Sequence, residues 1–228
     1  MKALVLSSGG IDSTTCLAFA VDKYGKESVM SLSVFYGQKH GKELKAAEKI
    51  AAYYQVEHRE LDMGVIFADS DCTLLEGRGK VPEGDYASQL KRLGGKPVST
   101  YVPFRNGLFL AAAASVALSR GCEEIYYGAH ADDSAGNAYP DTSQAFHDAM
   151  GQAVYEGSGR ALRIVAPFIK SHKSQVVAAG LKLHVPYGLT WSCYEGGEKP
   201  CGKCATCIDR KKAFERNGVK DPAEYAKG

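Results

Sequence analysis

The sequence predicts an α/β protein with a doubly wound parallel sheet and a small metal-binding segment near the C-terminal end. Two largely apolar stretches of strand length and a shorter third strand alternate with stretches of helical periodicity from residue 2 to residue 61, which is the β-α-β-α-β order of a parallel sheet with right-handed crossovers. A glycine-rich turn at residues 8–13 joins the first strand to the first helix. Four of the seven cysteines lie between residues 193 and 207. Such closely spaced cysteines are typical of structural metal sites.

The elements follow from apolar periodicity and from the turn residues between them. We expect strands at 2–7, 28–36, 56–61, 124–127 and 162–166, and helices at 13–24, 43–54, 86–93, 107–120, 142–155 and 174–181. Residues 63–101 are glycine-rich and irregular, which predicts an inserted loop that serves as a lid or a partner surface, or is disordered. The expected division is a nucleotide-binding domain at 1–188, which includes this insert, and a metal-binding segment at 189–228.

Composition and charge favour a soluble globular protein. Hydrophobic residues make up 45% of the chain and charged residues 24%, as in soluble globular proteins. The formal net charge of +2 gives no electrostatic argument for nucleic acid binding. The sequence has no apolar stretch of transmembrane length and no signal peptide pattern, and its cysteine count is odd, so we expect a cytoplasmic protein.

The turn after the first strand is a candidate phosphate cradle. Its sequence is Ser8-Gly9-Gly10-Ile11-Asp12-Ser13, followed by Thr14. Glycines let backbone N–H groups approach a ligand, and the helix that follows adds free N–H donors and a partial positive charge. The loop lacks the lysine of a Walker loop and the third glycine of a dinucleotide fingerprint. The alternative is an ordinary strand-to-helix turn capped by Asp12 or Ser13.

Polar residues also follow the other strands, at the edge where parallel α/β sheets bind ligands. Gln38 and His40 follow the second strand, and His40 either lines a nucleotide pocket or is a polar residue near a helix start. Arg105 and Asn106 precede an alanine-rich helix. There Arg105 could bind a phosphate or carboxylate through paired hydrogen bonds, or Asn106 could simply cap the helix.

A second group lies after the fourth strand. Asp132 and Asp133 follow His130, and carboxylates there could hold Mg²⁺ with phosphate oxygens; Asp133 could instead cap the next turn. Tyr139 and Asp141 belong to a Tyr-Pro-Asp sequence. Asp141 could cap the helix that follows, or its carboxylate could accept the paired N–H groups of a guanine-like edge. Further on, Lys170 and Lys173 lie beside a helix start, where a lysine could neutralise leaving pyrophosphate.

The four clustered cysteines form the second strong motif. Cys201, Cys204 and Cys207 make two overlapping C-x-x-C steps, and Cys193 supplies a fourth thiol. This spacing favours structural tetrahedral zinc, with all four positions occupied by protein. An iron–sulfur cluster or disulfides are the alternatives. Zinc would hold in place a tail that shows no core of its own, with a free energy of roughly 10 kcal/mol or more.

Together these motifs resemble the 7-cyano-7-deazaguanine synthase family (QueC) of queuosine biosynthesis. The loop resembles the PP-loop of N-type ATP pyrophosphatases. The sequences Y-G-Q-K-H, P-F-R-N, Y-P-D and E-x-x-x-x-P-C-G-K-C-x-x-C extend the likeness over nearly the whole chain. The chain differs in carrying Thr142-Ser143 after Y-P-D, where the family is expected to have Cys-Arg.

The resemblance implies a set of roles. The catalytic residues would be Asp12, Ser13, Arg105 and Lys173, and the metal ligands Cys193, Cys201, Cys204 and Cys207. ATP would bind to Ser8, Gly9, Gly10, Ile11, Asp12, Ser13, Thr14, Gln38 and His40. The substrate would bind to Arg105, Asn106, Asp133, Tyr139 and Asp141.

The implied reaction is an ATP-dependent ligation of ammonia to 7-carboxy-7-deazaguanine that ends in the nitrile. It passes through an adenylated acid and an adenylated amide, and it uses ATP, Mg²⁺ and Zn²⁺. The resemblance also suggests a homodimer. The rival hypotheses are a PP-loop tRNA-modifying enzyme, such as a thiolase or a lysidine synthetase, and a non-enzymatic zinc-ribbon adaptor with a retained nucleotide fold.

Overall fold

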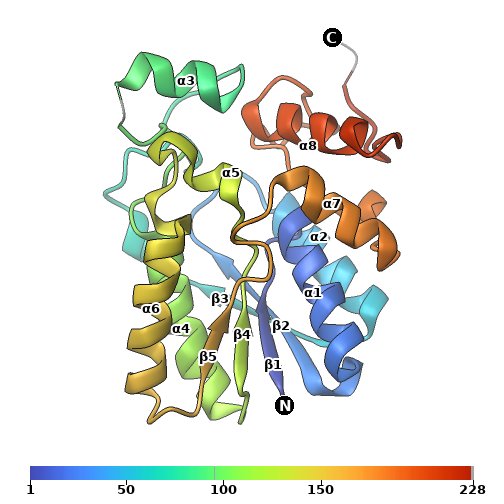
Figure 1. Ribbon diagram of the computed structural model, residues 1–228. Helices are drawn as coiled ribbons and strands as arrows, with labels where there is room; N and C mark the ends of the chain where they lie inside the picture. The colour runs from blue at the N-terminus through green and yellow to red at the C-terminus, as the bar shows by residue number, and fades with distance from the viewer. Residues whose placement is uncertain (95, 227–228) are drawn as a thin grey trace.

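A parallel sheet forms the centre of the computed structural model, which describes residues 1–94 and 96–226. Within these residues the strands lie in the order β3-β2-β1-β4-β5, all parallel (Figure 1). Their bounds are β1 Ala3–Leu6, β2 Val29–Phe35, β3 Glu57–Asp62, β4 Glu124–Tyr126 and β5 Arg163–Val165. On one side of β1 the strands β2 and β3 follow in chain order, and on its other side β4 and β5 follow. The strand order therefore reverses beside β1, and such a switch point is where open α/β sheets bind ligands.

Helices cover both faces of the sheet (Figure 1). On one face lie α1 Ile11–Tyr24, α2 Lys42–Tyr54 and α7 Lys173–Lys182, and on the other α4 Arg105–Ser119 and α6 Gln144–Gly157. Three further helices lie beyond the carboxyl ends of the strands: α3 Tyr86–Leu93, α5 Ala131–Ser134 and α8 Ala205–Arg216. Single 3-10 turns occur at Lys26–Ser28, Gly64–Phe67, Ala135–Asn137, Pro140–Thr142 and Tyr187–Leu189.

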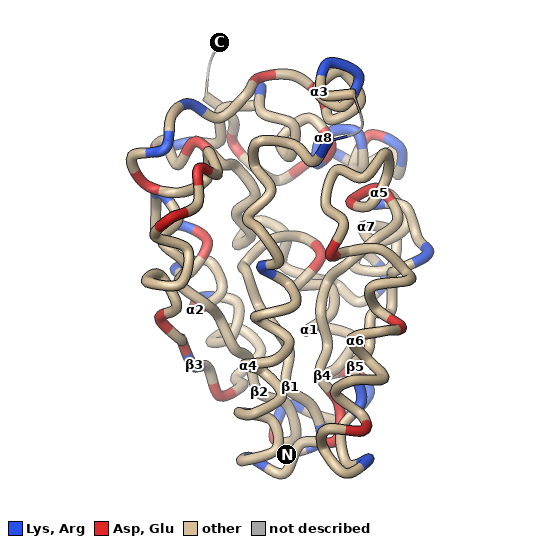
Figure 2. Tube along the Cα trace, turned by 90° about the vertical axis from the view of Figure 1, so that its left-hand side faces the viewer, with Lys and Arg blue, Asp and Glu red and all other residues tan. Residues whose placement is uncertain are grey.

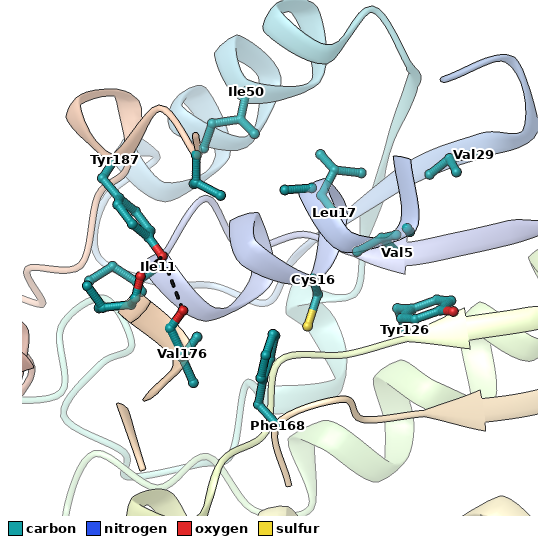
Figure 3. Packing of buried hydrophobic residues seen from close by; sticks show 14 of the residues in the cluster. Val5, Ile11, Cys16, Leu17, Val29, Ile50, Tyr126, Phe168, Val176 and Tyr187 are labelled. Atoms are coloured by element: carbon teal, nitrogen blue, oxygen red, sulfur yellow. Dashed lines mark hydrogen bonds between the residues drawn. The ribbon is translucent and has the colours of Figure 1, made fainter. Parts of the chain in front are cut away.

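Alternate residues of β1 feed two separate cores. Val5 packs on the α1 face with Leu17 and Val176, while Leu4 packs on the α4 face with Leu110. All of these side chains are fully buried, because a central parallel strand has no exposed face. Figure 3 shows the α1-side core, where the Tyr187 hydroxyl donates to the carbonyl oxygen of Val176 at 3.4 Å.

The expected sheet is confirmed, and two local expectations are wrong. Helix α4 begins at Arg105 rather than at 107, so Arg105 and Asn106 belong to its first turn. The tail, which is expected from sequence to have no core of its own, contains the helix α8. Phe214 of α8 is 1% exposed and belongs to the main core.

The stretch predicted as an insert packs against the tail. The backbone N–H of Gly84 donates to the carbonyl oxygen of Lys203 at 3.0 Å, and Glu83 forms an isolated bridge with Cys204. Phe67 and Leu75 share a buried cluster with the cysteines. Residue 95 of this stretch and residues 227–228 of the tail lie outside the described residues.

Two surface properties bear on function. Along the described part of the chain, no helix is both long and apolar enough to cross a membrane. Figure 2 shows Lys and Arg positions interspersed with Asp and Glu positions rather than gathered on one element. This distribution agrees with the small net charge.

Candidate functional site

A cleft lies at the carboxyl edge of the sheet, beside the switch point. Its volume is about 220 Å³. The loop after β1, the end of β2, the first turn of α4 and the segment after β4 form its walls. Tyr86 of α3 also lines it, and so do five residues of the tail: Trp191, Ser192, Tyr194, Thr206 and Asp209. The cleft is therefore assembled from segments that are far apart in the sequence.

The glycine-rich loop is held tightly at the base of the cleft. Gly9 has φ +75°, and a Cβ atom there would lie 2.3 Å from the carbonyl oxygen of Glu43. On the other side of the loop, a Cβ atom at Gly128 would lie 2.8 Å from the backbone nitrogen of Ser13. Only glycine fits both positions, so the loop and the start of α1 are wedged between α2 and the end of β4.

Hydroxyl groups fix the shape of this loop. The Ser13 hydroxyl accepts a hydrogen bond from the Ser8 backbone N–H at 3.1 Å, and the two serine hydroxyls are also 3.1 Å apart. Thr14 donates its hydroxyl to the carbonyl oxygen of Gly10 at 2.6 Å, and Thr14 does not line the cleft. The N-cap of α1 is Gly10, with no side-chain cap, so Asp12 and Ser13 do not cap the helix.

Asp12 points to a lysine from the opposite side of the site. Lys173 Nζ lies 2.7 Å from Asp12 Oδ2 and 3.3 Å from His130 Nε2. Burial alone would raise the pKa of Asp12, but Lys173 and His130 outweigh it and hold that pKa below its usual value. For Lys173 burial opposes the charge, yet Asp12 and Asp133 keep its pKa above normal. The lysine is therefore a fixed cation in the wall of the cleft.

His130 is the buried centre of this cluster. It is 1% exposed, and its Nε2 lies 3.3 Å from Asp133 Oδ1 and 3.6 Å from Asp12 Oδ1. Burial raises the pKa of Asp133, although His130 and Lys173 oppose the shift. Asp132 faces away from the cleft: its carboxylate accepts from the Lys173 backbone N–H at 2.8 Å and pairs with His172 at 2.7 Å. Asp132 thereby anchors the start of α7, which carries Lys173.

The first turn of α4 forms another wall. The Arg105 guanidinium donates to the Tyr36 hydroxyl at 3.2 Å and lies 5.1 Å from the centre of that ring. Glu43 of α2 faces the same side of the cleft. Burial raises the pKa of Glu43 to about 7, although Arg105 opposes the shift. An arginine held by an aromatic ring in a partly closed cleft is suited to binding an anionic or carbonyl group.

Asp141 forms a hydrogen bond with the first turn of α4 and does not cap the helix that follows it in the sequence. Its Oδ2 accepts the backbone N–H of Asn106 at 2.8 Å, and Asp141 is 3% exposed. Ser143 caps α6, accepting from the Phe146 N–H. Asn106 is not a cap either, because the N-cap of α4 is Phe104. Asp141 does not line the cleft, so it holds Arg105 and Asn106 in place from behind.

Tyr86, Tyr139 and Tyr194 line the cleft together, and their hydroxyl groups contact one another. The Tyr139 hydroxyl donates to that of Tyr86 at 3.1 Å, and the Tyr86 and Tyr194 hydroxyls are 3.3 Å apart. They come from the segment after β4, from α3 and from the tail. The Thr100 hydroxyl, 2.6 Å from that of Tyr139, extends the chain of hydroxyls.

Gln38 and His40 have different positions. Gln38 lines the cleft, and its Oε1 accepts the Tyr36 backbone N–H at 2.7 Å. His40 lies behind the cleft wall, with Nε2 3.3 Å from the carbonyl oxygen of Tyr194 and its ring edge-on to Trp191. His40 therefore supports the tail, and it is not among the residues that line the cleft.

The four thiols of the tail converge. Their sulfur atoms all lie within 4.8 Å of one another, and a tetrahedral ion with thiolate bonds of 2.3 Å needs sulfurs about 3.8 Å apart. The Cys201 sulfur accepts backbone N–H groups from Lys203 and Cys204, each at 3.4 Å. This donor set fits a metal ion that binds four sulfurs.

Most of the residues predicted from sequence meet at the cleft. Those that line it are Ser8, Gly10, Ile11, Asp12, Ser13, Gln38, Arg105, Asn106, Asp133, Tyr139 and Lys173. Gly9, Thr14, His40 and Asp141 stand just behind its walls. Sequence reasoning missed Glu43 and Tyr194, although Glu43 lies three residues after His40 in the same predicted turn-to-helix stretch.

Comparison with known proteins places the chain in one family over nearly its whole length. The family model for queuosine biosynthesis protein QueC matches residues 2–218. A 7-cyano-7-deazaguanine synthase of Archaeoglobus fulgidus is 43% identical over 223 residues, covering 97% of this chain and 89% of that protein. A synthase of the same name from Caldicellulosiruptor saccharolyticus is 42% identical over 226 residues, covering 99% of this chain and 96% of that protein.

Solved structures of lower identity share the fold. The NMN synthetase from Francisella tularensis aligns with a TM-score of 0.54 at 16% identity, over 96% of this chain and 78% of that one. The U34-tRNA thiolase NcsA from Methanococcus maripaludis aligns with a TM-score of 0.51 at 16% identity, over 95% of this chain and 66% of that one. At such identities the likeness concerns the fold alone.

Proposed function

Because the chain belongs to the QueC family, we propose that it is an ATP-dependent carbon–nitrogen ligase that converts 7-carboxy-7-deazaguanine and ammonia to 7-cyano-7-deazaguanine in queuosine biosynthesis. The observation that carries this proposal is the family match over residues 2–218. The cleft supports it, since a phosphate-binding loop, a fixed lysine and a held arginine face one another there. Both relatives described above bear the synthase name, so a tRNA-modifying enzyme is not favoured.

The reaction needs two rounds of activation. First, a carboxylate oxygen attacks the α-phosphorus of ATP and pyrophosphate leaves. Ammonia then attacks the acyl carbon, AMP leaves, and one proton is released with formation of the amide. In the second round the amide oxygen attacks a second ATP, pyrophosphate leaves, and AMP departs as the nitrogen loses its two protons. Both carboxylate oxygens therefore end in AMP.

The residues of the loop would bind and orient the phosphates. Ser8, Gly10 and Ser13 present N–H and hydroxyl groups at the start of α1, where anions are stabilised. Lys173 would neutralise the charge that develops on pyrophosphate, and Asp12 would hold that lysine in position. Gly9, Ile11 and Thr14 would maintain the shape of the loop around the nucleotide. Gln38 would face the nucleotide from the cleft wall, and His40 would support that wall from behind.

On the substrate side, Arg105 would contact the carboxylate that is activated. Asn106 and Tyr139 line the same wall, where they could hydrogen-bond the flat bicyclic ring. Asp141 would act indirectly, through its hydrogen bond to the first turn of α4. The tyrosine cluster and the tail would limit the access of water, which otherwise hydrolyses an acyl adenylate.

Two metal ions fit the side chains present. Asp12 Oδ1 is buried and has no hydrogen-bond partner among the described residues, and Asp133 lines the cleft. One or two such carboxylates are what Mg²⁺ uses beside phosphate oxygens. Bound Mg²⁺ would supply charge neutralisation at the phosphates. Cys193, Cys201, Cys204 and Cys207 would hold Zn²⁺, which with four protein ligands is structural. We further propose that free ammonia is the nitrogen donor and that the protein is a cytoplasmic homodimer.

Isotope labelling tests the function and the adenylation chemistry together. The protein is incubated with Mg-ATP, ammonium and 7-carboxy-7-deazaguanine that carries ¹⁸O in both carboxylate positions, and products are followed by mass spectrometry. The expected result is the nitrile with two AMP per product, each bearing one ¹⁸O atom. A nitrile with ADP and labelled phosphate would refute adenylation. ATP consumption that requires tRNA and yields no nitrile would refute the function.

A further inference from the structure

The proposed substrate needs a partner for the donor edge of its ring. A 2-amino-4-oxopyrrolopyrimidine presents an N–H group and an adjacent amino group, side by side, and a carboxylate can accept both in a paired arrangement. Donors that enter a cleft without finding acceptors lose binding free energy. Asp141, the residue that the sequence suggests for this role, already accepts the Asn106 N–H and does not line the cleft.

Four carboxylates do line the cleft: Asp12, Glu43, Asp133 and Asp209. Asp12 is paired with Lys173 at 2.7 Å, and Asp133 with His130 at 3.3 Å. Burial raises the pKa of Asp209, and the charge of Lys173 opposes that shift. The Glu43 carboxylate lies within the electrostatic influence of Arg105, and no described residue forms a hydrogen bond or an ion pair with it.

The surroundings of Glu43 suit a flat ring with donors on one edge. Tyr36 and Phe109 flank Arg105 with ring centroids 5.8 Å apart, which gives an aromatic wall. Arg105 and Glu43 influence each other electrostatically, yet no ion pair within 4.0 Å joins them. A ligand with an acceptor beside its donors could therefore lie between the guanidinium and the carboxylate.

We infer that Glu43 is the residue that recognises the amino-oxopyrimidine edge of the substrate, with Arg105 donating to the neighbouring oxo group. This inference rests on the proposed function. The oxo group and the 7-carboxylate are neighbours on the bicyclic ring, so one guanidinium, with its five N–H donors, can reach both. Glu43 then accepts hydrogen bonds from the ring N–H and the amino group. In this orientation the substrate's own carboxylate, which is to be activated, points toward Arg105 and the glycine-rich loop.

The test compares Glu43→Gln with wild type on two substrates: 7-carboxy-7-deazaguanine and its analogue without the 2-amino group. A site built to accept a donor rejects the analogue that lacks it, so wild type should prefer the amino substrate by about 100-fold or more in kcat/KM. Gln turns a donor of its own toward the substrate edge. The variant should therefore raise KM for the amino substrate by about 100-fold and reduce the preference at least tenfold, with KM for ATP unchanged.

Two controls keep the test decisive. Glu48→Gln changes an exposed glutamate of the same helix and should alter neither KM. Glu43→Asp keeps a carboxylate and should keep the preference for the amino group, even where packing lowers the overall rate. The inference fails if Glu43→Gln raises KM equally for both substrates, or if it raises KM for ATP instead. It also fails if Asp209→Asn, rather than Glu43→Gln, loses the preference for the substrate with the amino group. Failure of wild type to form nitrile would count against the proposed function itself.

Discussion

The buried ion pair between Arg210 and Asp221 should contribute a large share of the stability of the tail. Their side chains are 2% and 8% exposed. Arg210 Nε and Nη2 each donate to Asp221 at 2.9 Å. The guanidinium also donates to the Thr190 hydroxyl at 2.7 Å, to the Tyr187 carbonyl at 3.1 Å and to the Ser192 hydroxyl at 3.4 Å. Asp221→Asn removes the negative charge but leaves the guanidinium buried.

Breaking a buried pair in this way costs about 3–5 kcal/mol in the free energy of unfolding. For a chain of this size each kcal/mol lowers Tm by about 2–4 °C, so we expect a fall of roughly 6–20 °C. The assay is thermal and denaturant unfolding of the metal-loaded protein at pH 7, followed by circular dichroism. In Arg210→Met/Asp221→Asn the loss should be smaller than the sum of the two single losses, because no charge remains unpaired.

The pH dependence has a definite sign. Burial alone would raise the pKa of Asp221, but the hydrogen bonds from Arg210 outweigh it and hold the pKa below its usual value. The stabilisation is therefore complete above the unfolded pKa of about 3.9 and is lost as pH falls through the lower folded value. The control is Glu224→Gln, which removes an exposed pair with Lys199 and should leave Tm unchanged. An Asp221→Asn protein as stable as this control would refute the reasoning.

Three further outcomes test the site. Gly9→Ala places a Cβ atom 2.3 Å from a carbonyl oxygen of α2 at φ +75° and should lower kcat/KM for nitrile formation at least about 100-fold, whereas Gly41→Ala, with open space around it, should not. Lys173→Met should lower kcat by about 10²–10³-fold in steady-state assays, with KM for the acid substrate little changed; equal losses in binding would contradict its role. Cys204→Ser should lose the one zinc per chain that metal analysis is expected to find, while Cys122→Ser, outside the cluster, should retain it.

The sequence was sufficient for those parts of the fold that depend on local patterns. Central strands such as residues 29–35 are mostly apolar, with two buried serines, because both faces are covered. The phosphate loop could be found because its chemistry is contiguous in the chain. The edge strand β3 has the polar sequence Glu57–Asp62, and it was predictable only from its place in the β-α-β-α-β order.

The remaining features depend on tertiary contacts that local patterns do not contain. Helix α8 is polar for most of its length, and its buried Arg210 is tolerated only because Asp221, eleven residues later, accepts its charge. Asp141 has the position of a helix cap in the sequence, but folding brings it to the N-terminus of α4 instead. Glu43 could not be recognised because nothing in a helical sequence reveals that one glutamate faces a cleft and Glu48 faces solvent.

The cysteine-rich tail forms part of the wall of the cleft rather than an appendage. The Trp191 backbone N–H donates to the carbonyl oxygen of Gly9 at 2.9 Å, which joins the tail to the glycine-rich loop. Thr206 and Asp209 line the cleft from the first turns of α8, and the metal-site residue Cys207 lies between them in the sequence. A metal held by the four thiols would therefore fix that part of α8 against the loop. This contact gives a physical reason for one chain to combine a proposed phosphate loop at its start with four cysteines near its end.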